Sequence, residues 1–255
     1  MRRREKFVIT ALVLSGLFLG IQYTNLNFRG IGVGIFGLAT YLVATWALVD
    51  DLDPHERLTI VPFPALFAVG LAWFYFLLPT TILTRVLVAG LFSIGLYAIL
   101  LTANIFSVAK GRTIQLLYAA HAVWLFFTLL TSLLFMNTIF SLKLPVYLVA
   151  AFTFLSHVPL FFMSLSSVKL KDSIAQETVW ITLLISLVVT ELAVCLSFFP
   201  FSVWYSALFI MSAVYISLGV VQSLLRERLF TRTWREYSLV AGFVILLFIL
   251  VFPGK

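Results

Sequence analysis

Nine long apolar runs, separated by short polar segments, make up most of the chain. They extend over residues 7–23, 31–49, 58–78, 82–108, 114–138, 146–168, 178–199, 202–225 and 238–252. Most hold about the 20 residues that a helix needs to cross the hydrocarbon core of a bilayer, and the last run is the shortest. The pattern predicts an all-α, polytopic membrane protein with nine transmembrane helices. Because the connections are short, residues 1–255 should form a single membrane-embedded domain.

The first run, Phe7 to Tyr23, follows three arginines and has the outline of a signal peptide. It is long enough to span, and residues 21–24 lack the small-residue pattern of a cleavage site. We therefore expect an uncleaved first helix.

Basic residues are distributed unequally between the two sides that nine spans define. With the N-terminus inside, inner segments hold Arg2, Arg3, Arg4, Lys6, Arg57, Lys110, Arg112, Lys169, Lys171, Arg226, Arg228, Arg232 and Arg235. Only Arg29, Arg85, Lys143 and Lys255 fall on the outer side or in an outer helix end. The positive-inside rule thus predicts an N-in, C-out orientation.

Composition agrees with a lipid environment. Hydrophobic residues make up 62% of the chain and charged residues 11%, which excludes a water-soluble domain. The net charge of +7 indicates inner-side basic residues rather than a nucleic-acid partner, and the basic segment Arg226–Arg235 should attract anionic lipids. Cys195 is the only cysteine, so the chain forms no internal disulfide. A plasma or inner membrane location is expected.

The two halves of the chain show a faint repetition. A shift of 121 positions places Asp51 on Asp172 and Glu56 on Glu177, which suggests two halves at residues 31–140 and 152–252. This alignment predicts a parallel internal repeat of four helices each, preceded by one extra helix, as some transporters have. The alternative is coincidence, because apolar helices resemble one another.

The acidic turn after the second span is the first candidate site. Asp50, Asp51 and Asp53 lie within four positions, and a pair of carboxylates can hold Mg²⁺ together with a substrate phosphate. A local alternative exists, because Asp53-Pro54-His55-Glu56 has the pattern of a capping box that opens a helix. No cofactor is expected apart from Mg²⁺ if the first reading holds.

The nine-helix layout with acidic turns after helices 2 and 6 resembles the intramembrane prenyltransferases. Asp50-Asp51-Leu52-Asp53 would be the first motif of that family, and Asp172 with Glu177 the second. The resemblance implies that these residues hold Mg²⁺ and a prenyl pyrophosphate at the cytoplasmic mouth of a cavity open to lipid.

Two charged residues lie within predicted spans. Glu191 is nine residues before Pro200 and Arg85 six after Pro79, which puts both at similar depth below the outer surface. An Arg85–Glu191 ion pair is one interpretation. In the other, Arg85 extends to the surface and Glu191 is neutral and hydrogen bonded.

Three further polar residues are candidates for a substrate or ion pathway. His121 and His157 lie inside spans, and Pro159 should kink the helix that carries His157. Asn104 could face the same inner cavity as His121. The alternative is that each bonds a neighbouring helix.

Three functions fit these residues. A transporter-like protein, or one that binds a small solute or lipid, agrees with the repeat and the polar residues within spans. A non-catalytic subunit, acting with a partner membrane protein or as an oligomer, agrees with the scarcity of intramembrane charge. A Mg²⁺-dependent enzyme rests on the acidic turns, and we lean away from enzymatic activity.

Overall fold

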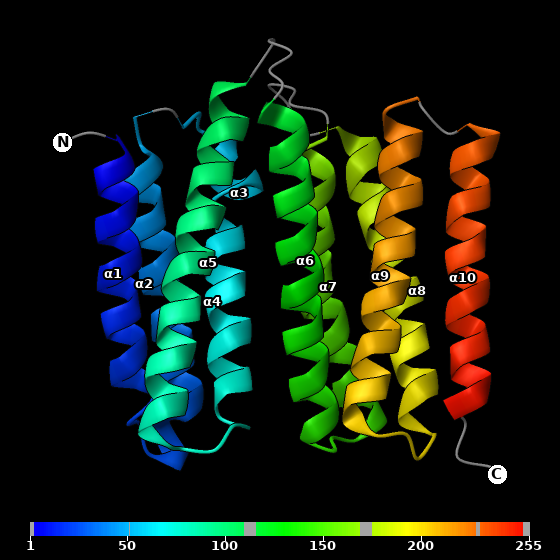
Figure 1. Ribbon diagram of the computed structural model, residues 1–255, viewed down its shortest axis with the longest axis horizontal. Coiled ribbons are helices and arrows are strands. Elements are labelled where there is room, and N and C mark those ends of the chain that lie inside the picture. Colours follow the sequence, from blue (N-terminus) through cyan, green and yellow to red (C-terminus); the bar gives the residue numbers. More distant parts are fainter. Residues whose placement is uncertain (1–2, 51, 110–115, 169–174, 228–229, 252–255) are drawn as a thin grey trace. The chain divides into compact units, whose positions relative to one another are not determined.

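The computed structural model describes residues 3–50, 52–109, 116–168, 175–227 and 230–251, and throughout these ranges every regular element is a helix (Figure 1). The elements are α1 (Arg3–Ile21), η1 (Leu26–Phe28), α2 (Arg29–Leu48), α3 (Glu56–Thr59), α4 (Pro62–Tyr75), α5 (Ile82–Val108), α6 (Leu116–Ser141), α7 (Val146–Ser166), α8 (Gln176–Ser197), α9 (Val203–Leu225) and α10 (Thr231–Val251). An all-helical fold is therefore confirmed.

Eight stretches of the described chain are long and apolar enough to cross a membrane. They correspond to the second to ninth predicted spans, with η1 continuing into α2 and α3 into α4. The first predicted span is also a helix, α1, but it opens with the charged residues Arg3, Arg4, Glu5 and Lys6. Its apolar part therefore begins at Phe7, and the first span, and with it a total of nine, stays a prediction.

The third span is divided between α3 and α4. Pro62 stands at the start of α4, where its missing N–H costs nothing, and the chain bends at Ile60 and Val61. Ahead of the break, the backbone N–H of Asp53 donates to a carboxylate oxygen of Glu56 at 2.9 Å, which is half of a capping box.

The last helix is longer than its apolar run. It begins at Thr231 rather than near residue 238, so Arg232 and Arg235 stand on the helix and not in a loop. Arg232 Nε and Glu236 Oε1 are 3.2 Å apart, one turn along the same face. Charged residues are compatible with a helix, and in α10 they occupy the first two turns, ahead of the apolar run.

The chain divides into two compact units, Met1–Thr131 and Ser132–Lys255, with the boundary inside α6. In unit 1, α1 packs on α2 and α5, and α4 packs on α2 and α5. Its core is aromatic: the ring of Phe92 lies 5.3 Å from that of Phe18, 5.6 Å from Phe36 and 5.9 Å from Phe67. Such ring pairs contribute more than their buried area alone.

Unit 2 is built on a close pairing of α7 with α8, against which α9 packs, and α10 packs on α9. The α9–α10 contact depends on a small residue. A Cβ atom added at Gly219 would lie 2.2 Å from the ring of Tyr237, so glycine lets the tyrosine ring lie against the backbone of α9.

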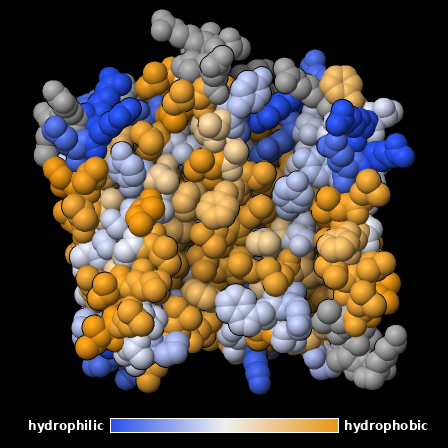
Figure 2. All heavy atoms as spheres, viewed as in Figure 1, coloured by the Kyte–Doolittle hydropathy of each residue, from blue (hydrophilic) through white to orange (hydrophobic). Residues whose placement is uncertain are grey.

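Apolar side chains cover the middle of the helices in each unit, and hydrophilic ones gather near the helix ends (Figure 2). Leu12, Ile35 and Ile94 in unit 1 and Leu155, Leu184 and Ile249 in unit 2 are exposed. In water such a surface would drive aggregation, whereas lipid tails solvate it.

Candidate functional site

One end of unit 2 is formed by the α6–α7 and α8–α9 turns together with the C-terminal part of α10 (green, yellow and red in Figure 1). Two adjoining cavities lie at this end. Both are lined by Leu196, Phe201 and Ser206, so the two cavities are adjacent.

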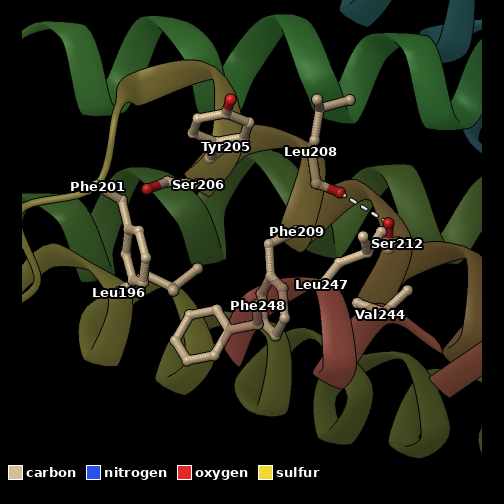
Figure 3. Close-up of a pocket in the computed structure, with 10 residues that line it drawn as sticks. All are labelled: Leu196, Phe201, Tyr205, Ser206, Leu208, Phe209, Ser212, Val244, Leu247 and Phe248. Carbon is tan, nitrogen blue, oxygen red and sulfur yellow. Dashed lines mark hydrogen bonds between the residues drawn. The ribbon is translucent and has the colours of Figure 1, made fainter. Parts of the chain in front are cut away.

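The first cavity is apolar and has a volume of about 230 Å³. It is lined by residues of α8, α9 and α10 and of the α8–α9 turn: Leu196, Phe201, Tyr205, Ser206, Leu208, Phe209, Ser212, Val244, Leu247 and Phe248. Figure 3 shows the rings of Phe201 and Phe209 near that of Phe248, and their centroids lie 4.9 and 5.0 Å from it. The hydroxyl of Ser212 donates to the carbonyl of Leu208 at 2.9 Å, which leaves it little polarity to offer a ligand.

The second cavity, of about 270 Å³, has a mixed lining. Lys143, from the α6–α7 turn, lines it together with the polar side chains of Ser197 and Ser206. Among the described residues that line either cavity, Lys143 is the only charged one. This cavity therefore offers a cation next to an apolar compartment.

The backbone places Lys143 in an unusual conformation. Its φ of 46° is in the left-handed region, where an L-residue is disfavoured. The turn requires it: α6 ends at Ser141, and the N–H of Lys143 donates to the carbonyl of Phe140 at 3.3 Å. Pro145 then caps α7, so only Leu142 to Leu144 connect the two helices. Glycine usually occupies such a position, and the chain keeps a lysine there instead.

A cation beside an apolar cavity suits an amphiphile. Anionic headgroups pair with ammonium groups, and acyl chains fill apolar space without hydrogen bonds. Tyr205 and Trp204, both exposed near the start of α9, are residue types that favour the headgroup region of a bilayer.

His157 is fully buried in unit 2 and both its ring nitrogens are hydrogen bonded. Nδ1 lies 2.9 Å from the carbonyl oxygen of Thr153, which can only accept, so this nitrogen carries the proton. Nε2 then accepts from the hydroxyl of Ser132 at 2.9 Å. The ring thus joins α6 to α7 in a neutral form, the interhelical bond that was the alternative to a pathway role.

Arg85 lies in unit 1 and Glu191 in unit 2. Arg85 stacks on Tyr23, with its Cζ atom 4.1 Å from the ring centroid. Glu191 is exposed on α8. Their ion pair stays a prediction.

The remaining polar candidates lie in unit 1. The ring of His121 packs against that of Phe106, with 5.0 Å between centroids, and Phe106 follows Asn104 by two residues on α5. His121 and Asn104 are both half-buried. The predicted inner cavity between them stays a prediction.

Of the five acidic candidates, the structure describes Asp50, Asp53 and Glu177. Asp50 forms an ion pair with Lys6, Oδ2 to Nζ 2.5 Å, and the Lys6 ammonium lowers the pKa of the Asp50 carboxyl below its usual value. Asp53 belongs to the turn capped by Glu56, and Glu177 lies in the first turn of α8. Asp51 and Asp172 lie outside the described residues. Within the described ranges, no three metal-ligating side chains form a group.

Sequence reasoning missed the cavities of unit 2. Lys143 entered only as an outer-side basic residue, and Phe201, Phe209 and Phe248 looked like any other membrane phenylalanines. One signal was present: under the inferred orientation, Lys143 was among the few basic residues against the positive-inside trend.

All-helical architecture, apolar spans and a lipid-compatible surface define a multi-pass helical membrane protein. Within this class, the chain belongs to the family described as Protein of unknown function (DUF5656), which matches residues 50–251. The match takes in α3 to α10, and so both cavities of unit 2. No curated protein and no solved structure matches the chain.

Proposed function

We propose that the protein binds an amphiphilic lipid in unit 2. The acyl chain occupies the apolar cavity between α8, α9 and α10, and an anionic headgroup lies beside Lys143. The observation that carries the proposal is the pair of adjoining cavities that share Leu196, Phe201 and Ser206, one of them apolar and the other lined by the cationic Lys143. Together they match the two chemically different parts of a lipid.

Of the two related functions expected from the sequence, transport and the binding of a small solute or lipid, we propose binding. A proton or ion relay needs groups that can change their partners, whereas both nitrogens of His157 are bonded within the helix pair. A subunit role stays an alternative, favoured by the exposed carboxylate of Glu191 on α8, which a partner membrane protein could satisfy. Mg²⁺-dependent chemistry depends on Asp51 and Asp172 and stays a prediction.

An N-in orientation in the cell membrane would put this lipid site in the outer leaflet. Trp180 at the start of α8 and Trp234 at the start of α10 are exposed, as expected of residues at the inner membrane boundary, and exposed Trp204 at the start of α9 fits the outer boundary.

The packing within each unit supports the parallel repeat. In unit 1, α2, α4 and α5 contact one another, as do α7, α8 and α9 in unit 2.

Filling the apolar cavity tests the proposal. In Ser212→Phe the new ring enters the cavity from α9, and the lost hydroxyl bonded only its own helix. Ser217→Phe is the matched control, because Ser217 also bonds its own helix, at 2.7 Å to Ala213, and does not line the cavity. Native mass spectrometry of the full-length protein with phosphatidylglycerol counts the retained lipids.

We expect Ser212→Phe to retain one lipid fewer than the wild type and Ser217→Phe to retain the same number. Equal retention by all three proteins would refute a site in this cavity. Circular dichroism checks that both variants keep their helix content.

A further inference from the structure

Polar and cationic side chains gather at one end of unit 1, where α1 ends and α5 begins. This cation cluster comprises Gln22, Tyr23, Arg29, Tyr75 and Arg85. Helix α1 packs against α5, where the hydroxyl of Ser15 donates to the carbonyl of Ala89 at 2.9 Å and Arg85 stacks on Tyr23, so the two helices run antiparallel. The end of α1 therefore lies beside the first turn of α5, which carries Arg85.

Both arginines stack on aromatic rings. Arg85 Cζ lies 4.1 Å from the ring centroid of Tyr23, and Arg29 Cζ lies 4.4 Å from that of Phe76. The rings of Tyr75 and Phe76, 5.8 Å apart, connect the two arginines, and Arg85 also interacts electrostatically with Tyr75. Stacking uses the face of a guanidinium, whereas its N–H donors point outward in the plane. Each arginine is thus held in place with donors left over.

Several buried polar atoms of the cluster lack a hydrogen-bond partner among the described residues. They are Nε of Arg29, Nε of Arg85, the hydroxyl of Tyr75 and both amide atoms of Gln22. Tyr75 is only 1% exposed and Gln22 only 5%. Buried polar groups are nearly always paired with protein, water or ligand, so these polar atoms, most of them donors, indicate that a further partner binds here.

Unit 1 supplies no carboxylate at this end among its described residues. The acidic residues of unit 1 are Glu5 and those between positions 50 and 56, before α1 turns apolar or after α2, and no Asp or Glu occurs from residue 57 to 171. Neither Arg29 nor Arg85 has an ion pair within described unit 1. The nearest described ion pair of that unit, Lys6 with Asp50, joins the start of α1 to the end of α2.

We propose that the cation cluster binds an oxyanion, specifically a phosphate group. A guanidinium presents paired donors that match two phosphate oxygens, and the Tyr75 hydroxyl and Gln22 amide add neutral donors. Because the cluster lies at helix ends, at the depth of lipid headgroups, the phosphate belongs either to a phospholipid or to a soluble compound. This site is separate from the lipid site of unit 2.

The test uses Tyr75→Phe in the full-length protein. Its hydroxyl makes no hydrogen bond of standard geometry with the described residues, while its ring packs on Phe18 at 5.7 Å, so the variant keeps the ring packing and removes a donor that a ligand could use. Arg57→Gln is the control, because it removes a basic residue from an exposed position in the other end of unit 1. Both are made in a Ser212→Phe background, in which the apolar cavity of the unit 2 site is filled. Binding of phosphatidylglycerol and of inorganic phosphate is titrated separately in neutral detergent.

We expect Tyr75→Phe to weaken binding about tenfold, because a hydrogen bond to a charged group is lost. Its thermal midpoint should stay the same or rise, and Arg57→Gln should bind as the parent does. Binding of phosphatidylglycerol alone assigns the site to a lipid headgroup, and binding of both ligands assigns it to phosphate in general. No binding of either, or an equal loss in Tyr75→Phe and Arg57→Gln, would overturn the proposal. Its failure leaves the Ser212 experiment untouched.

Discussion

Replacing Lys143 by glycine should change stability and lipid binding in opposite directions. An L-residue in the left-handed region costs about 1–2 kcal/mol, and glycine avoids that cost at φ 46°. Glycine in turn loses more backbone entropy on folding than lysine does, which offsets about 0.5–1 kcal/mol of that gain in stability. The net gain is about 0.5–1 kcal/mol, or roughly 1–4 °C in the thermal midpoint.

The same change removes the only cation among the described residues that line the proposed lipid site. Because Lys143 is exposed, its attraction for a headgroup is partly screened by water, and we expect affinity for phosphatidylglycerol to fall only about fivefold. Thermal unfolding followed by circular dichroism measures the first effect. Lipid titration monitored by native mass spectrometry measures the second.

Two variants separate the causes. Lys143→Gln removes the charge but keeps a non-glycine residue in the left-handed conformation, so it should lose lipid affinity without a gain in the thermal midpoint. Glu227→Gly relieves the other left-handed residue, at φ 56°, in the α9–α10 turn, so it should gain stability and bind lipid normally. A Lys143→Gly protein that binds as tightly as the wild type would refute the role of the ammonium. A lower midpoint would refute the backbone argument.

Three further outcomes follow from single contacts. The Lys6 ammonium lowers the pKa of Asp50, so the ion pair stabilises the fold above the usual carboxyl pKa of 3.8 and this stabilisation is lost as pH falls through the lowered pKa. In Lys6→Gln the thermal midpoint should therefore depend less on pH between about pH 5 and 3. A pH profile equal to that of the wild type would contradict the role of this pair. Ser132→Ala leaves the buried Nε2 of His157 without a donor and should cost about 1–3 kcal/mol in unfolding experiments, and a neutral result would mean that another group supplies the proton. Gly219→Ala forces the Tyr237 ring off α9, so a cysteine pair across α9 and α10 should cross-link more slowly than in the wild type; an equal rate would show that the ring swings aside freely.

Much of the secondary structure could be read from the sequence. The apolar runs match the helices within a few residues, apart from α10, because in lipid the backbone must satisfy its own hydrogen bonds and an apolar stretch of spanning length has to be helical. The break before Pro62 and the bond between Asp53 and Glu56 were also predictable, since both depend on neighbouring residues.

The lipid site was not predictable in this way. Membrane helices are apolar on all faces, so the hydrophobic pattern does not show which side of α9 faces α10 and which faces lipid. The candidates from sequence were the rare polar residues, such as His157, whose bonds the structure shows to be internal to its helix pair. The cavity instead uses ordinary phenylalanines.

The sequence by itself determined the class of protein and the extent of its helices, because both depend on composition and local spacing. Tertiary structure alone decided the chemistry. It placed Lys143 beside an apolar cavity, stacked Arg29 and Arg85 on rings from other segments, and buried polar atoms of Tyr75 and Gln22 that make no standard hydrogen bond with the described residues. Such juxtapositions depend on which helices pack together, and residues distant in the chain carry no local sign of meeting.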